Sequence, residues 1–233
     1  MAFNAQQTSR VRAIVLMVAL VVVAAVALFV VTGGFAPAGT AGSQGSAATG
    51  EATGAEAAGD DASAADAMET VDAQYGTAAQ SLLAQLEQDP SNPTALLNVA
   101  NGYFDWGVAA LNHATDDDDR AHATELLEQA IGYYDEYLAD NAGAKSALVD
   151  RAICVFYTGD HASAIAALED LTQNVDPGFA PAWANLGMFY ENDGRTDDAR
   201  QAYEIAIEAA GDADAYGVRD YAQDRLDALN GTS

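Results

Sequence analysis

The residues best suited to chemistry gather around one short acidic run. His113 and His122 flank four consecutive aspartates, Asp116–Asp119, and imidazole with carboxylate could hold a metal ion. The spacing disfavours such a site, because zinc-binding histidines on a helix stand four residues apart, while calcium loops alternate their ligands and turn on a glycine. We therefore expect a solvated loop whose last aspartate caps a helix starting near Arg120. Cation binding by this loop stays open.

The remaining chemical groups lack a motif around them. Cys154 is the only cysteine, so neither a disulfide within the chain nor a thiolate metal cage can form. It lies in the apolar run Ala152–Phe156, which favours a small buried hydrophobic residue over an intermolecular disulfide. The third histidine, His161, and the serines have no catalytic context, and there is no glycine-rich phosphate loop. We expect no enzymatic activity, no catalytic residue, no metal and no cofactor.

The charge of the chain is strongly acidic and unevenly placed. The 35 acidic and 9 basic residues give a formal net charge of -26, and no acidic residue precedes Glu51. Such a charge repels nucleic acid and anionic headgroups and favours cationic partners. The alternative is that acidity is a general solubility trait of the source organism. Nucleic acid is therefore not an expected partner.

One long apolar segment lies near the N-terminus. Ala13–Val31 contains no charged residue, Arg10 and Arg12 precede it, and the next basic residue is Arg120. About 20 apolar residues span the hydrocarbon core of a bilayer, and basic flanks stay on the cytoplasmic side. The sequence predicts a cytoplasmic tail (residues 1–12), a transmembrane helix (13–32) and a C-terminal part outside the cytoplasm. The protein would be a single-pass protein of the cell membrane.

A cleaved signal peptide is the competing interpretation of this segment. Ala36–Ala38 has the small-x-small pattern of a cleavage site, although the apolar run is longer than the roughly 7–15 residues of a signal core. Residues 33–66 follow, rich in Gly, Ala, Ser and Thr and without an aromatic residue after Phe35. Such a composition buries too little apolar surface to fold, which indicates a flexible linker.

From Ala67 onward the pattern becomes helical. Apolar residues recur every three or four positions, without the alternation of strands. Prolines are excluded from helix interiors and therefore mark turns. They form two short clusters, Pro90 with Pro93 and Pro177 with Pro181. The sequence predicts an all-α domain over residues 67–230.

One stretch of this domain carries an internal repeat signature. Residues 182–207 resemble the tetratricopeptide repeat (TPR), Trp-x2-Leu-Gly-x2-Tyr followed by Ala-x3-Tyr-x2-Ala. Two antiparallel helices can approach closely where residues are small, and large residues fill the space around such contacts. The small residues of the pattern are Gly187, Ala199 and Ala206, and the large ones are Trp183, Tyr190 and Tyr203.

Two weaker copies precede this repeat, which occupies residues 180–213. In the copy at 145–179, Arg151 replaces the usual leucine and could form a salt bridge or extend to solvent. The copy at 93–144 has 52 residues, against about 34 in an ordinary repeat. We expect both of its helices to be lengthened and to meet in a loop at His113–Asp119. Residues 67–88 and 214–230 look like capping helices, the latter with Asp220, Asp224, Arg225 and Asp227 on a polar outer face.

The resemblance implies an α-solenoid, a right-handed superhelix of antiparallel helix pairs. In that family the first helices line a concave groove that binds peptide segments or partner helices, and an asparagine at the position of Asn98 and Asn185 often bonds the ligand backbone. In this register the groove residues are Asn98, Asn101, Asp105, Asp150, Ile153, Tyr157, Asn185, Met188, Glu191 and Asn192.

These groove positions indicate the kind of ligand. None of them is basic, so we do not expect the clamp with which some chaperone-binding relatives hold a C-terminal carboxylate. A segment with basic or apolar side chains fits better by charge. The resulting hypothesis is a membrane-tethered interaction module, a scaffold or assembly factor that binds other proteins outside the cytoplasm. The alternatives are a structural self-associating protein and a TPR factor of the cytochrome c maturation type, and the oligomeric state stays open.

Overall fold

The structure, a computed structural model, describes residues 67–212 and 214–231, and its regular elements in these ranges are all helical. The predicted transmembrane helix (13–32) and linker (33–66) lie outside the described residues. Within the described ranges, none of the helices combines the length and apolarity needed to cross a bilayer. The all-α prediction for the C-terminal part is confirmed.

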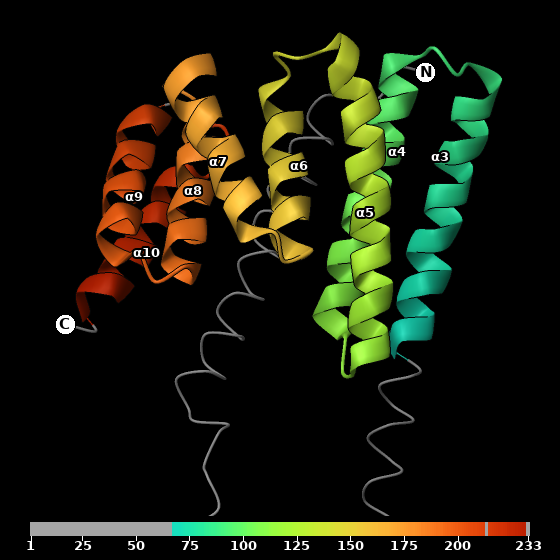
Figure 1. Ribbon diagram of the computed structural model, residues 1–233, viewed down its shortest axis with the longest axis horizontal. Coiled ribbons are helices and arrows are strands. Elements are labelled where there is room, and N and C mark those ends of the chain that lie inside the picture. The colour runs from blue at the N-terminus through green and yellow to red at the C-terminus, as the bar shows by residue number, and fades with distance from the viewer. Residues whose placement is uncertain (1–66, 213, 232–233) are drawn as a thin grey trace, which may run out of the picture.

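The helices stand side by side, roughly parallel or antiparallel, from α3 at one edge to α9 and α10 at the other (Figure 1). The first of them is helical from residue 67 and contains one π-helical stretch, η1, before α3. In chain order the elements are η1 (Asp72–Gly76), α3 (Thr77–Gln88), α4 (Pro93–His113), α5 (Asp117–Asp140), α6 (Lys145–Tyr157), α7 (His161–Asp170), η2 (Leu171–Val175), α8 (Ala180–Asn192), α9 (Thr196–Ala210) and α10 (Val218–Gly231).

Local sequence explains where several of these helices begin. The Asn92 side chain accepts hydrogen bonds from the backbone N–H groups of Thr94 and Ala95, and Pro93 fills the first helical position, where no N–H is needed. Asp160 caps α7 in the same way through the N–H of Ser163. Each of these residues satisfies backbone donors that the first turn of a helix leaves unpaired.

The long hairpin α4–α5 differs from its prediction in its loop. Both helices are long, 21 and 24 residues, and α3, α4 and α5 extend beyond α6 at one end (Figure 1). However, the loop spans only residues 114–116 and not the predicted His113–Asp119. Asp116, the first aspartate of the run, accepts the N–H of Asp119 at 2.8 Å. Because this cap starts the helix at Asp117, the three later aspartates form its first turn and favour the helix dipole.

The last helix also begins later than residue 214. Asp214 has a positive φ of 21°, and its carboxylate accepts the N–H groups of Val218 and Arg219. It therefore stands before α10 as a capping residue, and residues 214–217 belong to a connection that ends at Gly217, with φ of 68°. This connection holds Tyr216 at the surface, 38% exposed.

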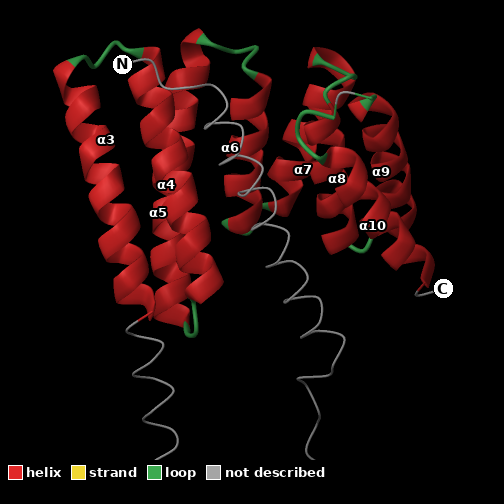
Figure 2. Ribbon diagram, turned by 180° about the vertical axis from the view of Figure 1, so that it is seen from behind, coloured by secondary structure: helices red, strands yellow, loops and turns green. Residues whose placement is uncertain are grey.

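The first and second helices of the hairpins form two rows. The first helices contact one another in series, α4 with α6, α6 with α8, and α8 with α10. Among the described residues the second helices α5, α7 and α9 have no comparable contacts with one another; each packs between the first helices of its own and the next hairpin. Figure 2 shows the stack from behind. The closer spacing of the first helices places them on the inner side of the stack.

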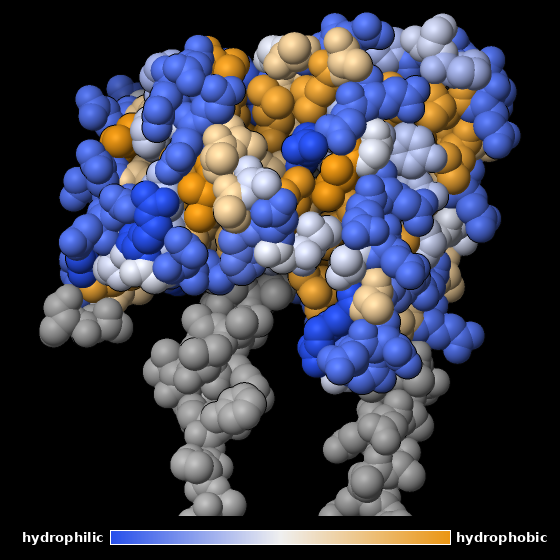
Figure 3. All heavy atoms as spheres, viewed as in Figure 1, coloured by the Kyte–Doolittle hydropathy of each residue, from blue (hydrophilic) through white to orange (hydrophobic). Residues whose placement is uncertain are grey.

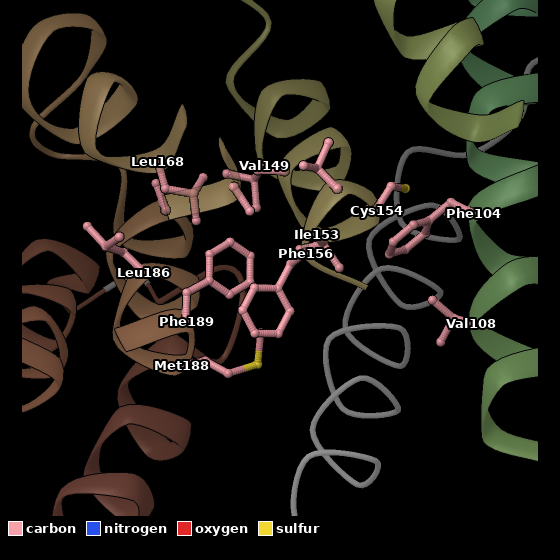
Figure 4. Packing of buried hydrophobic residues seen from close by; sticks show 14 of the residues in the cluster. Phe104, Val108, Val149, Ile153, Cys154, Phe156, Leu168, Leu186, Met188 and Phe189 are labelled. Carbon is pink, nitrogen blue, oxygen red and sulfur yellow. The ribbon is translucent and has the colours of Figure 1, made fainter. Parts of the chain in front are cut away.

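The core runs without a break from the first helix to α10. At its centre the rings of Phe156 (α6) and Phe189 (α8) stack with centroids 4.2 Å apart (Figure 4). On the face seen in Figure 3, hydrophilic residues dominate and apolar residues appear in strips between the helices. The predicted close contact at Gly187 is present, since a Cβ added there would lie 2.7 Å from the ring of Tyr203 in α9.

Candidate functional site

The inner row of first helices is where the sequence places a ligand groove. From α4, Asn98 is exposed, while Asn101 and Asp105 are half-buried. The Asn101 side-chain oxygen accepts a hydrogen bond of 2.8 Å from the hydroxyl of Tyr134, a fully buried residue of α5. Asn101 therefore helps to hold the long hairpin together, and Asn98 is the candidate of α4 that is open to solvent.

The α6 candidates surround a buried thiol. Ile153 is 2% exposed, and Cys154 beside it is fully buried, as predicted for a small hydrophobic residue. Burial raises the pKa of the Cys154 thiol, with smaller contributions in the same direction from Asp150 and Asp105. The helices that carry Asp105 and Asp150, α4 and α6, contact one another.

The α8 candidates divide into buried and accessible residues. Met188 is 3% exposed and Asn185 is 5% exposed. The Asn185 amide donates to the carbonyl of Pro181 in its own helix at 2.8 Å, so it satisfies that helix instead of standing open for a ligand backbone as Asn98 does. Asn192 is exposed at the end of α8, and Glu191 before it is half-buried.

Glu191 is the centre of a polar network that the sequence did not indicate. Its carboxylate accepts hydrogen bonds from the Tyr203 hydroxyl at 2.9 Å and from Arg225 Nε at 3.2 Å. Arg225 lies on α10, and the prediction that it belongs to a polar outer face is wrong, because α10 turns it toward α8. The Tyr203 hydroxyl also meets that of Tyr221 at 3.4 Å, and burial raises the pKa of Tyr221 to about 12.

Tyr157 is the last residue of α6. Burial raises the pKa of its phenol, and the charge of Tyr221 adds to the effect. Glu191, one of the predicted groove residues, contacts Tyr203 of α9 and Arg225 of α10. Only the helical spacing of α10 could have suggested Arg225, whose partner lies 34 residues away in sequence.

Arg151, the departure from the repeat pattern in α6, forms a salt bridge. Its guanidinium contacts the Asp135 carboxylate on α5, with Nη2 donating to Oδ2 at 3.3 Å. This contact settles the two possibilities left by the sequence. It joins the long hairpin to the next repeat at the surface, where one ion pair contributes little, about 0.2–1 kcal/mol.

The histidines next to the acidic run do not converge on a metal site. Within the described residues no group of three or more His, Cys, Asp or Glu side chains is arranged to hold an ion. His122 instead bonds Asp72 of η1 at 2.9 Å, and Trp106 Nε1 donates to the same carboxylate oxygen at 2.8 Å. His113 is exposed at the end of α4. Asp72 therefore fixes the first helix to the long hairpin.

Replacing Asp116 by alanine should lower the free energy of unfolding by about 1 kcal/mol, because the first turn of α5 loses its cap. Chemical denaturation of the full chain in detergent would measure the loss. Asp118→Ala is the matched control; Asp118 is exposed in the same turn and should cost only a few tenths of a kcal/mol. A cation site would instead be indicated if both variants lost the same unfolding free energy, and only when calcium or zinc was added. That result would contradict a capping role for Asp116.

Comparisons with known proteins agree with the repeat pattern. Residues 155–219 match the family model described as "Tetratricopeptide repeat". No curated protein matches the chain. The crystal structure of MamA is 20% identical, with 70% of this chain and 91% of that chain covered and a TM-score of 0.46.

Two further solved structures carry tetratricopeptide repeats. TTC0263, a thermophilic TPR protein in Thermus thermophilus, is 18% identical over 68% of this chain and 91% of that chain, with a TM-score of 0.45. The Sgt2 TPR domain from Aspergillus fumigatus is 25% identical over 57% of this chain and 82% of that chain, with a TM-score of 0.39. The described part of this chain is an all-α, tetratricopeptide-like solenoid.

Proposed function

We propose that the protein is a membrane-tethered interaction module that binds segments of other proteins on the inner side of its solenoid. The observation that carries the proposal is the unbroken row α4–α6–α8–α10, which places the first helices of successive hairpins on one surface. A solenoid presents an extended surface, since each repeat contacts only its neighbours. Such a surface fits a peptide segment or a partner helix, and we propose binding and not catalysis.

The accessible groove candidates lie on two helices of this surface, α4 and α8. Asn98 is exposed on α4 and Asn192 on α8, while half-buried Asp105 and Asp150 lie between them along the row. Asparagine side chains can both donate to and accept from a peptide backbone, which has the same two kinds of group. The surface therefore offers polar contacts that depend little on the ligand's sequence.

Charge defines the ligand further. Three basic residues on the inner-row helices, Lys145, Arg151 and Arg225, are each paired with a carboxylate, which leaves them poorly placed to hold a second one. The chain carries 35 acidic residues against 9 basic ones. A segment with basic or apolar side chains is attracted by this field, whereas an acidic C-terminus is repelled.

The anchor is the second part of the proposal. Ala13–Val31 would span the bilayer behind Arg10 and Arg12, and residues 33–66 would tether the solenoid outside the cytoplasm. With a reach of about 5–6 Å × √n, a flexible linker of this length places the domain some tens of ångströms from the bilayer. The membrane part of the proposal fails if carbonate washing releases the full chain from membranes.

The experiment compares two double variants that add the same charge on opposite sides of the solenoid. Asn98→Arg/Asn192→Arg should weaken binding of basic peptides from an array about tenfold, because it places cations on the inner row. The purified full chain in detergent would be applied to arrays of basic, apolar and acidic C-terminal peptides.

The matched control is Gln129→Arg/Gln201→Arg, whose exposed side chains lie on the second helices α5 and α9. It changes the net charge equally and should reduce binding less than about threefold through the long-range field alone. Equal losses in the two double variants would count against the inner row as the binding surface. Selective capture of acidic C-terminal peptides by the unmodified chain would contradict the predicted ligand chemistry.

A further inference from the structure

A second surface stands out at the end of the solenoid where the inner-row helices α6, α8 and α10 begin. Among the described residues the large hydrophobic side chains that are exposed are Val175, at 44%, and Tyr216, at 38%. Val175 is the last residue of η2, ahead of α8, and Tyr216 lies in the connection ahead of α10. Single exposed apolar residues are ordinary, but Tyr216 belongs to an aromatic cluster, and Val175 stands four residues before a member of that cluster, Phe179.

The cluster is aromatic and includes a cation. The rings of Tyr216 and Phe179 meet edge to face, with centroids 5.9 Å apart, and Lys145 Nζ lies 5.1 Å from the Phe179 centroid. Trp183, one turn into α8, is half-buried and donates from Nε1 to the Pro177 carbonyl of the same loop at 2.8 Å. We call Val175, Phe179, Trp183 and Tyr216 the aromatic patch.

The loops that carry the patch are held by specific contacts. Asp176 accepts hydrogen bonds from Lys145 and from the N–H of Gly178, and both lower the pKa of its carboxyl. Asp214 caps α10 through the N–H of Val218, and Arg219 bonds the Gly211 carbonyl across the connection. These contacts hold the residues on both sides of Tyr216, whose ring itself meets Phe179.

The patch lies at the opposite end of the solenoid from residue 67, where the described chain begins. α6, α8 and α10 begin at the same end of the solenoid, where their connections carry the patch (Figure 1). The first helix runs opposite to α4, so residue 67 lies at the other end. A helix of about 22 residues separates these ends by roughly 33 Å. The patch therefore stands about one helix length from the point at which the described chain begins.

Local charge indicates what that partner carries. Residues 170–179 and 208–219 contain five carboxylates (Asp170, Asp176, Glu208, Asp212 and Asp214), against Arg219 and the nearby Lys145. Lys145 already lies over the Phe179 ring, which shows that this surface accommodates a cation on an aromatic face. The exposed Tyr216 ring in the same acidic surroundings offers an equivalent place to an incoming cation.

We propose that the aromatic patch is a second docking surface, for a protein segment that carries arginine or lysine beside an apolar side chain. The cation would lie against the Tyr216 ring and near the carboxylates of the two connections, and the apolar side chain would cover Val175. The patch lies where α8 and α10 begin, at the opposite end of α8 from Asn192, so one partner could contact both surfaces.

Fluorescence anisotropy with three labelled peptides of about 12 residues tests the proposal on the full chain in detergent. The peptides contain arginine with leucine, glutamate with leucine, and arginine with serine. We expect the arginine–leucine peptide to bind about tenfold more tightly than the arginine–serine peptide, and the glutamate–leucine peptide not to bind. Val175→Ser/Tyr216→Ser should weaken the arginine–leucine peptide about fivefold to tenfold, while Tyr216→Phe, which keeps the ring, should bind nearly as the unmodified chain does.

The outcome is distinguishable from failure of the inner-row proposal. Asn98→Arg/Asn192→Arg changes the inner row alone and should leave binding at the patch within about twofold. The patch residues replaced are exposed, so circular dichroism should show unchanged folding. Unaltered affinity in Val175→Ser/Tyr216→Ser, or equal binding of the arginine–leucine and arginine–serine peptides, would overturn the proposal. Loss of binding in the inner-row variant instead would assign the peptide to the groove.

Discussion

Replacing Phe189 by alanine should lower the free energy of unfolding by about 3–5 kcal/mol, the largest effect we expect from a single change. The side chain is 0% exposed, and its ring stacks on Phe156 with an interplanar angle of 1° (Figure 4). Truncation removes buried apolar area and leaves a cavity between α6 and α8. Because repeats are stabilised by contacts with their neighbours, the loss falls on the junction between two hairpins.

Denaturant unfolding of the full chain in detergent, followed by circular dichroism, measures this change. Phe189→Leu should cost less, since it keeps most of the buried volume, and Val175→Ala, at a residue that is 44% exposed, should cost less than about 0.5 kcal/mol. A lower slope of unfolding with denaturant, or two separate transitions, would show that the hairpins no longer unfold together. A loss below about 1 kcal/mol in Phe189→Ala would argue against close packing at this junction.

The helix pair 180–213 could be predicted in detail because its signal is local. Gly187 and Ala199 are small residues placed between large ones at helical spacing. Small residues show which sides of the two helices can pack closely against each other. In the structure Ala199 is 0% exposed and Gly187 meets the Tyr203 ring, so the predicted contact is confirmed. The family model also matches this region, within residues 155–219.

The loop of the long hairpin could not be predicted from residue types alone. All four residues of Asp116–Asp119 are good capping residues, so propensity does not choose among them. The choice depends on how far α5 extends before it meets α4. In the structure the helix continues back to Asp117, and Thr115 donates both its N–H and its hydroxyl to Asp119. These hydrogen bonds lower the pKa of the Asp119 carboxyl.

The polar contacts of the candidate site depend on the stacking of whole repeats. Arg225 reaches Glu191 only because α10 packs beside α8, and nothing local in sequence links the two residues. Asn98 and Asn185 look equivalent in the repeat register, yet one is exposed and the other is 5% exposed and bonded to its own helix. The repeat pattern predicts on which side of its helix a residue lies. How deeply that residue is buried depends on the neighbouring helices in the stack.

The aromatic patch also could not be predicted from the sequence. Phe179 and Tyr216 lie 37 residues apart in different connections, which carry no repeat signature of their own. Each connection has the composition of an ordinary turn containing glycine. Their meeting at 5.9 Å follows from the parallel starts of α8 and α10, which only the solenoid arrangement provides. Surfaces built from successive connections are therefore visible only in the folded chain.

Gly187→Ala should lower the free energy of unfolding by about 2–3 kcal/mol, although alanine is the better helix former. A Cβ at this position would lie 2.7 Å from two carbons of the Tyr203 ring. The ring cannot easily move aside, because Tyr203 is 0% exposed and its hydroxyl bonds Glu191 at 2.9 Å. The helices α8 and α9 must separate to admit one methyl group, which strains packing along both.

The matched change is Gly132→Ala in α5, where an added Cβ meets nothing within 4 Å. There the helix propensity acts alone, and we expect a gain of about 0.5–1 kcal/mol. Thermal or denaturant unfolding of the two variants beside the unmodified chain gives opposite signs for the same chemical substitution. If both stabilised the chain, the close approach of α8 and α9 at Gly187 would be wrong. The small residue at this position would then reflect only the repeat's sequence pattern and not a steric requirement of the solenoid.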